Sequence, residues 1–243
     1  MKSIQKLTFG LFTVVALTTV NTVNGAELEI NFTNGAELAS TVTGKANFNG
    51  SGDVLFSGSA TDTVKVTAGN VKVASNAVFG ADIVMNGGSL EATAAMDLPS
   101  MAVNVNSILT ADADVTLRGM SGTSKLAITG AGVVTPADLS AAPTAVDISN
   151  TVNVGASGSK LPAGTVTVLS GGLVDIKGSA ANCVPGAMEV ESGAKLQVES
   201  GLTIPNASSA NDLFGTLKFK SGAGLVLRDG AVWGRTIVVG TAL

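Results

Sequence analysis

Two acidic residues in the segment TADADVTL are the best candidates for chemistry in this sequence of 243 residues. Asp112 and Asp114 are two positions apart, so on a β-strand their carboxylates would lie on one face. Two adjacent carboxylates can bind Ca²⁺ or act as general acid and general base. The alternative is that both are solvated side chains of an outer face or a turn. We favour this alternative, and we expect no catalytic residue, no metal site and no cofactor.

Several other kinds of catalysis and binding are excluded by residue types that the sequence lacks. It contains no His, which excludes Ser-His-Asp hydrolysis and zinc sites built on His. The three arginines, Arg118, Arg228 and Arg235, do not cluster in sequence, and no GxxxxGK phosphate loop occurs. With Trp233 as the single Trp and no Tyr, an ordinary lectin groove lacks its aromatic platforms. The single cysteine, Cys183, excludes an intrachain disulfide; we interpret it as a small buried residue, with a free thiol or an intermolecular bridge as alternatives.

The N-terminus has the pattern of a secretory signal peptide. Lys2 and Lys6 give it a basic start, and residues 7–20 are apolar apart from Thr and Gly. This run is shorter than the ~20 residues of a membrane-spanning helix. We predict that residues 1–25 are a signal peptide cleaved after Gly25 and that no transmembrane segment remains afterwards. The expected location is outside a bacterium or on its surface, with the periplasm as an alternative.

The composition of the remaining chain favours β-structure and disfavours nucleic acid as a partner. Removal of residues 1–25 takes away two lysines and no acidic residue, which changes the net charge from −4 to −6. Such a chain lacks the clustered Lys and Arg that neutralise phosphates. Val, Thr, Ala, Ser, Gly and Asn dominate; β-branched residues favour strands, and Gly and Asn favour tight corners.

Similar segments, each with a strand, a polar-Gly corner and a second strand, recur along the chain. The clearest are VTVLSGGLVDI (166–176), MEVESGAKLQV (188–198) and LKFKSGAGLVL (217–227). The prolines between positions 143 and 205 give a second measure of the repeat length, because Pro cannot donate to a strand ladder and belongs at corners. The Ser-Gly corners and the prolines both recur at intervals of roughly 20–30 residues, which is typical of a solenoid.

Apolar and polar residues alternate within these segments, as in Val64-Lys65-Val66 and Leu196-Gln197-Val198. Such alternation buries one face of a strand and leaves the other in water. The many small residues and few aromatic ones favour an all-β solenoid of short strands around a narrow interior; an antiparallel β-sandwich is the alternative. We predict an N-terminal cap region at residues 26–60 and solenoid repeats at residues 61–243.

The segments GTVTVLSGGLVDIKGSA (164–180) and GAMEVESGAKLQVESG (186–201) resemble the repeats of bacterial autotransporter passenger domains. The resemblance covers about residues 60–235. It implies a right-handed parallel β-helix displayed outside a Gram-negative cell, often as an adhesin. Autotransporters continue into a C-terminal membrane barrel with aromatic girdles, and we expect this chain to lack one, since it stops at TIVVGTAL.

Our functional hypothesis is a secreted or surface-displayed structural or adhesive protein that is not an enzyme. One alternative is a β-helical polysaccharide lyase or hydrolase with an atypical acidic site, and another is a split autotransporter passenger. The expected partners are proteins or cell surfaces, contacted by loops such as 93–101, 135–145 and 206–215. Residues 236–239 form an uncharged β-branched run that either folds back to cover the apolar interior or meets the end of another molecule. We favour the second alternative and also predict end-to-end self-association.

Overall fold

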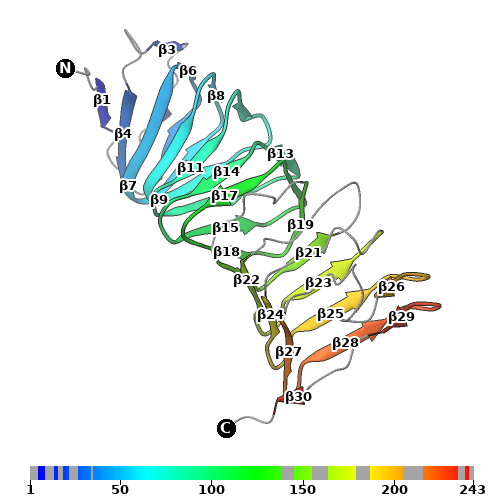
Figure 1. Cartoon of the computed structure of the whole chain (residues 1–243). Helices are drawn as coiled ribbons and strands as arrows, with labels where there is room; N and C mark the ends of the chain where they lie inside the picture. The colour runs from blue at the N-terminus through cyan, green and yellow to red at the C-terminus, as the bar shows by residue number, and fades with distance from the viewer. Residues whose placement is uncertain are drawn as a thin grey trace.

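The structure is a computed structural model in which parallel strands stack into an elongated β-solenoid (Figure 1). Strand β1 (Gln5–Thr8) lies at one end of the stack and β30 (Val239–Gly240) at the other. The residues that the structure describes are 5–8, 14–15, 19–21, 27–33, 35–137, 145–154, 164–178, 187–204, 216–234 and 239–240.

The described residues form an all-β fold without a helix, and their strands pair in parallel. The prediction of a β-solenoid is therefore confirmed, and the antiparallel sandwich is excluded because it requires antiparallel pairs. The described strands form sheets of seventeen, seven, four and two strands.

The large sheet contains two rows of strands in the first coils, because β9 (Val64–Val73) pairs with β11 (Ile83–Met85) through residues 64–66 and with β12 (Ser89–Ala92) through residues 70–73. The seven-stranded sheet forms a further face of the solenoid. The large sheet consists of β1, β9, β11, β12, β30 and the strands β2 (Val14–Val15), β4 (Glu27–Thr33), β5 (Ala36–Leu38), β7 (Lys45–Phe56), β14 (Met101–Val103), β15 (Ser107–Ala111), β17 (Met120–Gly122), β18 (Lys125–Thr129), β20 (Ala145–Ile148), β22 (Thr165–Val168), β24 (Ala187–Val190) and β27 (Thr216–Lys220). The seven-stranded sheet consists of β13 (Met96–Leu98), β16 (Val115–Leu117), β19 (Val133–Pro136), β21 (Thr151–Val154), β23 (Leu173–Ile176), β25 (Lys195–Val198) and β28 (Gly224–Leu227).

Two smaller sheets lie toward the ends of the stack. The four-stranded sheet contains β3 (Thr19–Asn21), β6 (Thr41–Thr43), β8 (Ser59–Ala60) and β10 (Val78–Phe79). The two-stranded sheet contains β26 (Thr203–Ile204) and β29 (Val232–Trp233).

Each Ser-Gly segment makes a corner between two sheets and not a hairpin. In residues 165–176, β22 joins the large sheet and β23 joins the seven-stranded sheet. The corner glycine Gly171 has a φ of 85°, a left-handed conformation that only Gly adopts at little cost. The two strands of one segment therefore pair with strands of neighbouring coils and not with each other.

The register of the strand pairs confirms the spacing read from the sequence. Val64 of β9 lies opposite Ile83 of β11, so one coil takes about 20 residues, at the short end of solenoid repeats. Later coils are longer: Met188 of β24 lies opposite Val166 of β22 on one side and Leu217 of β27 on the other. These two later steps equal the intervals between the corner serines of the same coils, because each coil carries one such corner.

Inward-facing side chains form columns that run along the stack. One column passes from Ile30 through Phe48, Val66 and Met85 to Val103, and all five side chains are buried. Stacking of coils is what buries these side chains, because a single coil leaves both of its flanks open.

Aromatic side chains occur in the core of the first coils, although small inward residues were expected. The rings of Phe48 and Phe56 are 5.6 Å apart at an interplanar angle of 70°. Phe32 is accommodated because Gly50 and Gly69 lie beside it; a Cβ added to Gly50 would sit 2.5 Å from the Phe32 ring. Glycines in neighbouring coils thus make room for an aromatic ring in a narrow interior.

In the region expected as an N-terminal cap, residues 26–60, the described strands belong to the same stack of coils. β4 pairs in parallel with β7, and β7 pairs with β9. Within residues 1–25, the described strands β1, β2 and β3 pair in parallel with β4, β5 and β6.

Candidate functional site

The two acidic residues singled out in the sequence lie in the bend between β15 and β16. Both side chains are exposed, and neither belongs to a strand, so the expectation that they share a strand face is wrong. Asp114 Oδ1 accepts a hydrogen bond of 3.0 Å from the backbone N–H of Val133 in the next coil. Among the described residues, no group of three or more His, Cys, Asp or Glu side chains could hold a metal ion.

The hydrogen bond made by Asp114 has a counterpart at another corner of this solenoid. Asn106 Oδ1, at the corner before β15, likewise accepts a hydrogen bond of 3.0 Å from the N–H of Lys125 in the next coil. In both cases a short Asp or Asn side chain satisfies a backbone donor where the ladder is interrupted by a bend. Asp114 therefore has a structural role at this bend.

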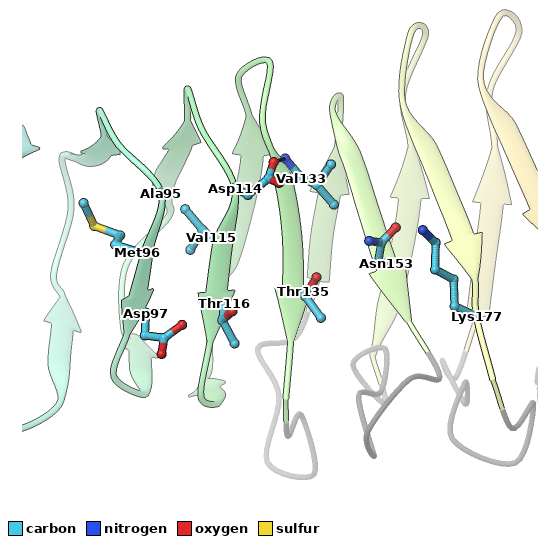
Figure 2. Close-up of a pocket in the computed structure, with 10 residues that line it drawn as sticks. All are labelled: Ala95, Met96, Asp97, Asp114, Val115, Thr116, Val133, Thr135, Asn153 and Lys177. Carbon is cyan, nitrogen blue, oxygen red and sulfur yellow. Dashed lines mark hydrogen bonds between the residues drawn. The ribbon is translucent and has the colours of Figure 1, made fainter. Parts of the chain in front are cut away.

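A groove of about 760 Å³ lies on the outer face of the seven-stranded sheet (Figure 2). It extends across β13, β16, β19 and β21 and reaches the residue that follows β23. Its polar side chains are Asp97, Asp114, Thr116, Thr135, Asn153 and Lys177.

Four of these polar side chains form a column along the groove. Asp97 lies opposite Thr116, and Thr116 lies opposite Thr135. Val134 pairs with Val152, which places Asn153 next to Thr135 in the following coil. Strands of one sheet are ~4.8 Å apart, so the floor of the groove offers one polar side chain per strand spacing.

The column continues beyond the groove into a buried position. Asn153 lies opposite Asp175, and Asp175 lies opposite Gln197. Asp175 is 5% exposed, and its Oδ2 lies 3.4 Å from the Lys177 ammonium. Its other oxygen, Oδ1, is buried without a hydrogen-bond partner among the described residues. Beyond the lining of the groove, the column therefore continues to a buried carboxylate with one oxygen that has no partner among the described residues.

Charge is distributed unevenly along the groove. Asp97 lies at one end and Lys177 at the other, while Asp114 lies between them beside Val133, as Figure 2 shows. Four strand spacings of ~4.8 Å separate Asp97 from Lys177, or about 19 Å. Groups this far apart do not act on the same bond, because general acids and bases must be within hydrogen-bond reach of it. The arrangement suits contact with a long ligand better than catalysis.

The sequence contained a signal for this column that the sequence analysis did not use. The triplets MDL, VTL, VTP, VNV, VDI and LQV each hold one polar residue between two apolar ones. Aligning these triplets coil by coil places their central residues in one column. The Ser-Gly corners, which give the interval between coils, mark where the sheets meet and not which residues share a column.

Two further residues noted in the sequence, Arg228 and Trp233, are not among the residues that line the groove. Arg228 donates a hydrogen bond of 3.3 Å to Gln197, and Trp233 packs half-buried against the hydrophobic core. Cys183 and Arg235 lie outside the described residues.

The outer face of the large sheet carries charged ladders. The Lys72 ammonium lies 3.0 Å from Asp53 Oδ2 and 3.4 Å from Glu91 Oε1. The hydrogen bond to Asp53, together with the charge of Glu91, raises the pKa of Lys72 above its ordinary value of 10.5. These contacts join three successive strands, β7, β9 and β12, so they stabilise the stack.

Comparisons with protein-family models, with curated proteins and with solved structures find no match for this chain. The part of the chain that the structure describes contains no helix long and apolar enough to cross a membrane.

Proposed function

We propose that the protein is a secreted or surface-displayed structural or adhesive component of a bacterium and is not an enzyme. The observation that carries this proposal is the continuous parallel stack, whose outer faces present ordered columns of polar side chains. A solenoid of this kind offers a long, rigid surface, and binding to such surfaces is what repeat proteins commonly do. The signal pattern of residues 1–25 supports a position outside the cytoplasm.

Adhesion and location can be tested together. Intact cells that produce the protein are treated with protease, and beads coated with the folded protein are applied to bacterial and epithelial cells. We expect the protein to be cleaved on intact cells and the beads to bind more strongly than beads coated with heat-unfolded protein. Protection from protease in intact cells, together with equal binding by both kinds of bead, would contradict the proposal.

A polysaccharide lyase or hydrolase is the second candidate function, because the groove contains both carboxylates and an ammonium group. The separation of Asp97 and Asp114 from Lys177 argues against it, as does the structural bond that Asp114 makes. Replacing Asp112 and Asp114 together by Asn keeps an oxygen acceptor at each position. We expect this double variant to fold and function like the wild type. Cleavage of polygalacturonate by the wild type alone would favour the enzyme.

We propose further that the molecules associate end to end. Residues 236–238 of the run expected to mediate this contact lie outside the described residues, while Val239 of β30 pairs with Phe219 of β27. Support comes from β28, the last described strand of the seven-stranded sheet, where Leu227 is 44% exposed although its partner Val198 is buried. Light scattering should show multimers that decrease when residues 236–243 are removed. A wild type that remains monomeric at high concentration would exclude this mode of assembly.

A further inference from the structure

The groove on the seven-stranded sheet presents side chains, and not backbone groups, to a ligand. The strands β16, β19, β21 and β23 each have a parallel partner on both sides. Their backbone N–H and C=O groups are therefore used within the sheet. A peptide that binds by adding a strand needs an open sheet edge. Among the described strands, β13 is an edge of this sheet because it pairs only with β16, so strand addition is confined to that end of the groove. Across the other strands of the groove, recognition comes from the polar column and from the apolar side chains beside it.

The polar column combines hydrogen-bond donors with acceptors. Thr116 and Thr135 each offer a hydroxyl that both donates and accepts, and Asn153, whose amide oxygen is buried, adds an amide group to the lining. Asp97 at one end accepts only. A ligand that fits this column carries groups that donate and accept at regular intervals, which is the behaviour of hydroxyl groups along a chain.

The buried carboxylate of Asp175 gives a second, independent indication of a ligand. It is only 5% exposed, and its Oδ1 has no hydrogen-bond partner among the described residues. An acceptor left unsatisfied in a buried position costs about 1–3 kcal/mol, and more when it is charged. Asn153, which lines the groove, is its neighbour in the column. A hydroxyl donated at this end of the groove would satisfy the oxygen.

The charge of the groove restricts the ligand further. Its ionised side chains are Asp97, Asp114 and Lys177, and the Lys177 ammonium is already paired with Asp175. Three Asp side chains and one Lys side chain give these four groups a formal net charge of −2. Polyanions such as uronates are repelled. Apolar contact is available from Met96 and Val133, which can pack against the C–H face of a sugar ring without an aromatic platform.

From these observations we propose that the groove binds an uncharged oligosaccharide lying across the strands of the seven-stranded sheet. The chain crosses β13, β16, β19 and β21, with successive hydroxyl groups on Asp97, Thr116, Thr135 and Asn153. Its end donates a hydroxyl to Asp175 Oδ1. This inference rests on the proposed adhesive function, since it assigns the adhesive contact to one face and one class of ligand.

The test uses isothermal titration of the purified full protein with hexasaccharides at up to millimolar concentration. The neutral probes are cellohexaose, maltohexaose and xylohexaose, and the charged probes are hexagalacturonate and the glucosamine hexamer. We expect at least one neutral hexasaccharide to bind, and to bind more tightly than its disaccharide, because the longer chain spans more strands. Failure of all three neutral probes to bind, or binding of only a charged probe, overturns the proposal.

A matched pair of double variants locates the binding site. Thr116→Val with Thr135→Val removes two groove hydroxyls while keeping the β-branched shape that strands favour. Thr110→Val with Thr129→Val removes a comparable pair from the large sheet, where the two hydroxyl oxygens are 3.1 Å apart. We expect the groove variant to lose at least tenfold in affinity and the control to bind as the wild type does. Equal binding by wild type and groove variant excludes this site.

The bead assay separates failure of this inference from failure of the proposed function. Beads coated with the Thr116→Val, Thr135→Val variant are compared with wild-type beads on the same cells. Reduced adhesion together with reduced oligosaccharide binding supports both proposals. Full adhesion without oligosaccharide binding overturns the groove assignment and leaves the adhesive function standing.

Discussion

At the scale of single residues, short polar side chains complete the hydrogen bonding where the strands bend. Asp114 and Asn106 each accept a backbone N–H from the following coil. Asp and Asn suit this task because their side-chain oxygens reach backbone groups that a bend leaves without a partner. Asp112 and Asp114 suggest a metal site in the sequence, but the presence of Asp114 is explained by its hydrogen bond at the bend.

Replacing Asp114 by Ala tests this explanation. The variant leaves the Val133 N–H without its acceptor, and we expect a loss of about 1 kcal/mol in unfolding free energy. Asp112→Ala is the control, because exposed side chains without such a bond change stability by less than about 0.5 kcal/mol. Urea denaturation followed by circular dichroism measures both. Equal stability of the two variants would contradict the corner role.

A pH dependence is expected from Glu189, whose carboxylate lies 3.1 Å from Lys218 and 3.3 Å from Lys220. The hydrogen bond from Lys218 lowers the pKa of Glu189 below its ordinary value of 4.5. A lowered folded-state pKa stabilises the protein above the unfolded-state value, and this contribution is lost as the pH falls through the folded-state value. Glu189→Gln should lower the melting temperature slightly at pH 7, and the difference should vanish below the lowered pKa. A difference that persists in strong acid would point to lost packing instead.

At the scale of secondary-structure elements, glycine sets how closely successive coils approach. Gly122, at the end of β17, has a φ of 128°, and a Cβ there would lie 2.1 Å from the carbonyl oxygen of Val103 in the preceding coil. Gly171 also has a positive φ, but a Cβ there would meet nothing within 4 Å. Gly122 is needed both for the close approach of two coils and for its positive φ, whereas Gly171 is needed for its positive φ alone.

The two glycines predict different costs for the same substitution. Gly171→Ala should cost about 1–2 kcal/mol, the strain of a left-handed Ala. Gly122→Ala should cost about 3 kcal/mol or more, because backbone must also move to relieve the clash. Chemical denaturation of both variants gives the comparison. Similar losses of unfolding free energy in the two variants would show that neighbouring coils can move apart at Val103 at little cost.

Much of this architecture could be predicted from the sequence because each coil repeats a short pattern. The alternation in Val64-Lys65-Val66 indicated a buried and an exposed face, and the Ser-Gly corners gave the interval between coils. The sequence did not reveal the Phe32 ring among glycines, since that contact joins residues from three coils. It also did not reveal the groove, because Asp97 and Asn153 can be assigned to the same column only when the length of every intervening coil is known.

At the scale of the whole molecule, the coils act as interchangeable units. Ile83 lies opposite Met101, and Met101 lies opposite Met120, so residues 101–119 form one complete coil. Each coil contacts chiefly its two neighbours, and stability is then roughly a sum over coils and their interfaces.

Deleting residues 101–119 should therefore give a shorter protein that still folds. The deletion brings Ile83 opposite Met120 and Met96 opposite Val134, which preserves the inward and outward faces. We expect β-sheet circular dichroism and a cooperative transition at a somewhat lower temperature. Deleting residues 101–109 instead shifts every later strand out of register and should prevent folding. A folded half-coil deletion would contradict the solenoid register.

The position of Trp233 in β29 has a consequence for spectroscopy. It is the single Trp of a chain that contains no Tyr, and it lies in the last coils that the structure describes. Intrinsic fluorescence therefore reports on one extremity of the molecule, whereas far-ultraviolet circular dichroism averages over all coils. If that extremity frays before the rest, the two signals will give different midpoints, and the gap between them measures how far cooperativity extends along the stack.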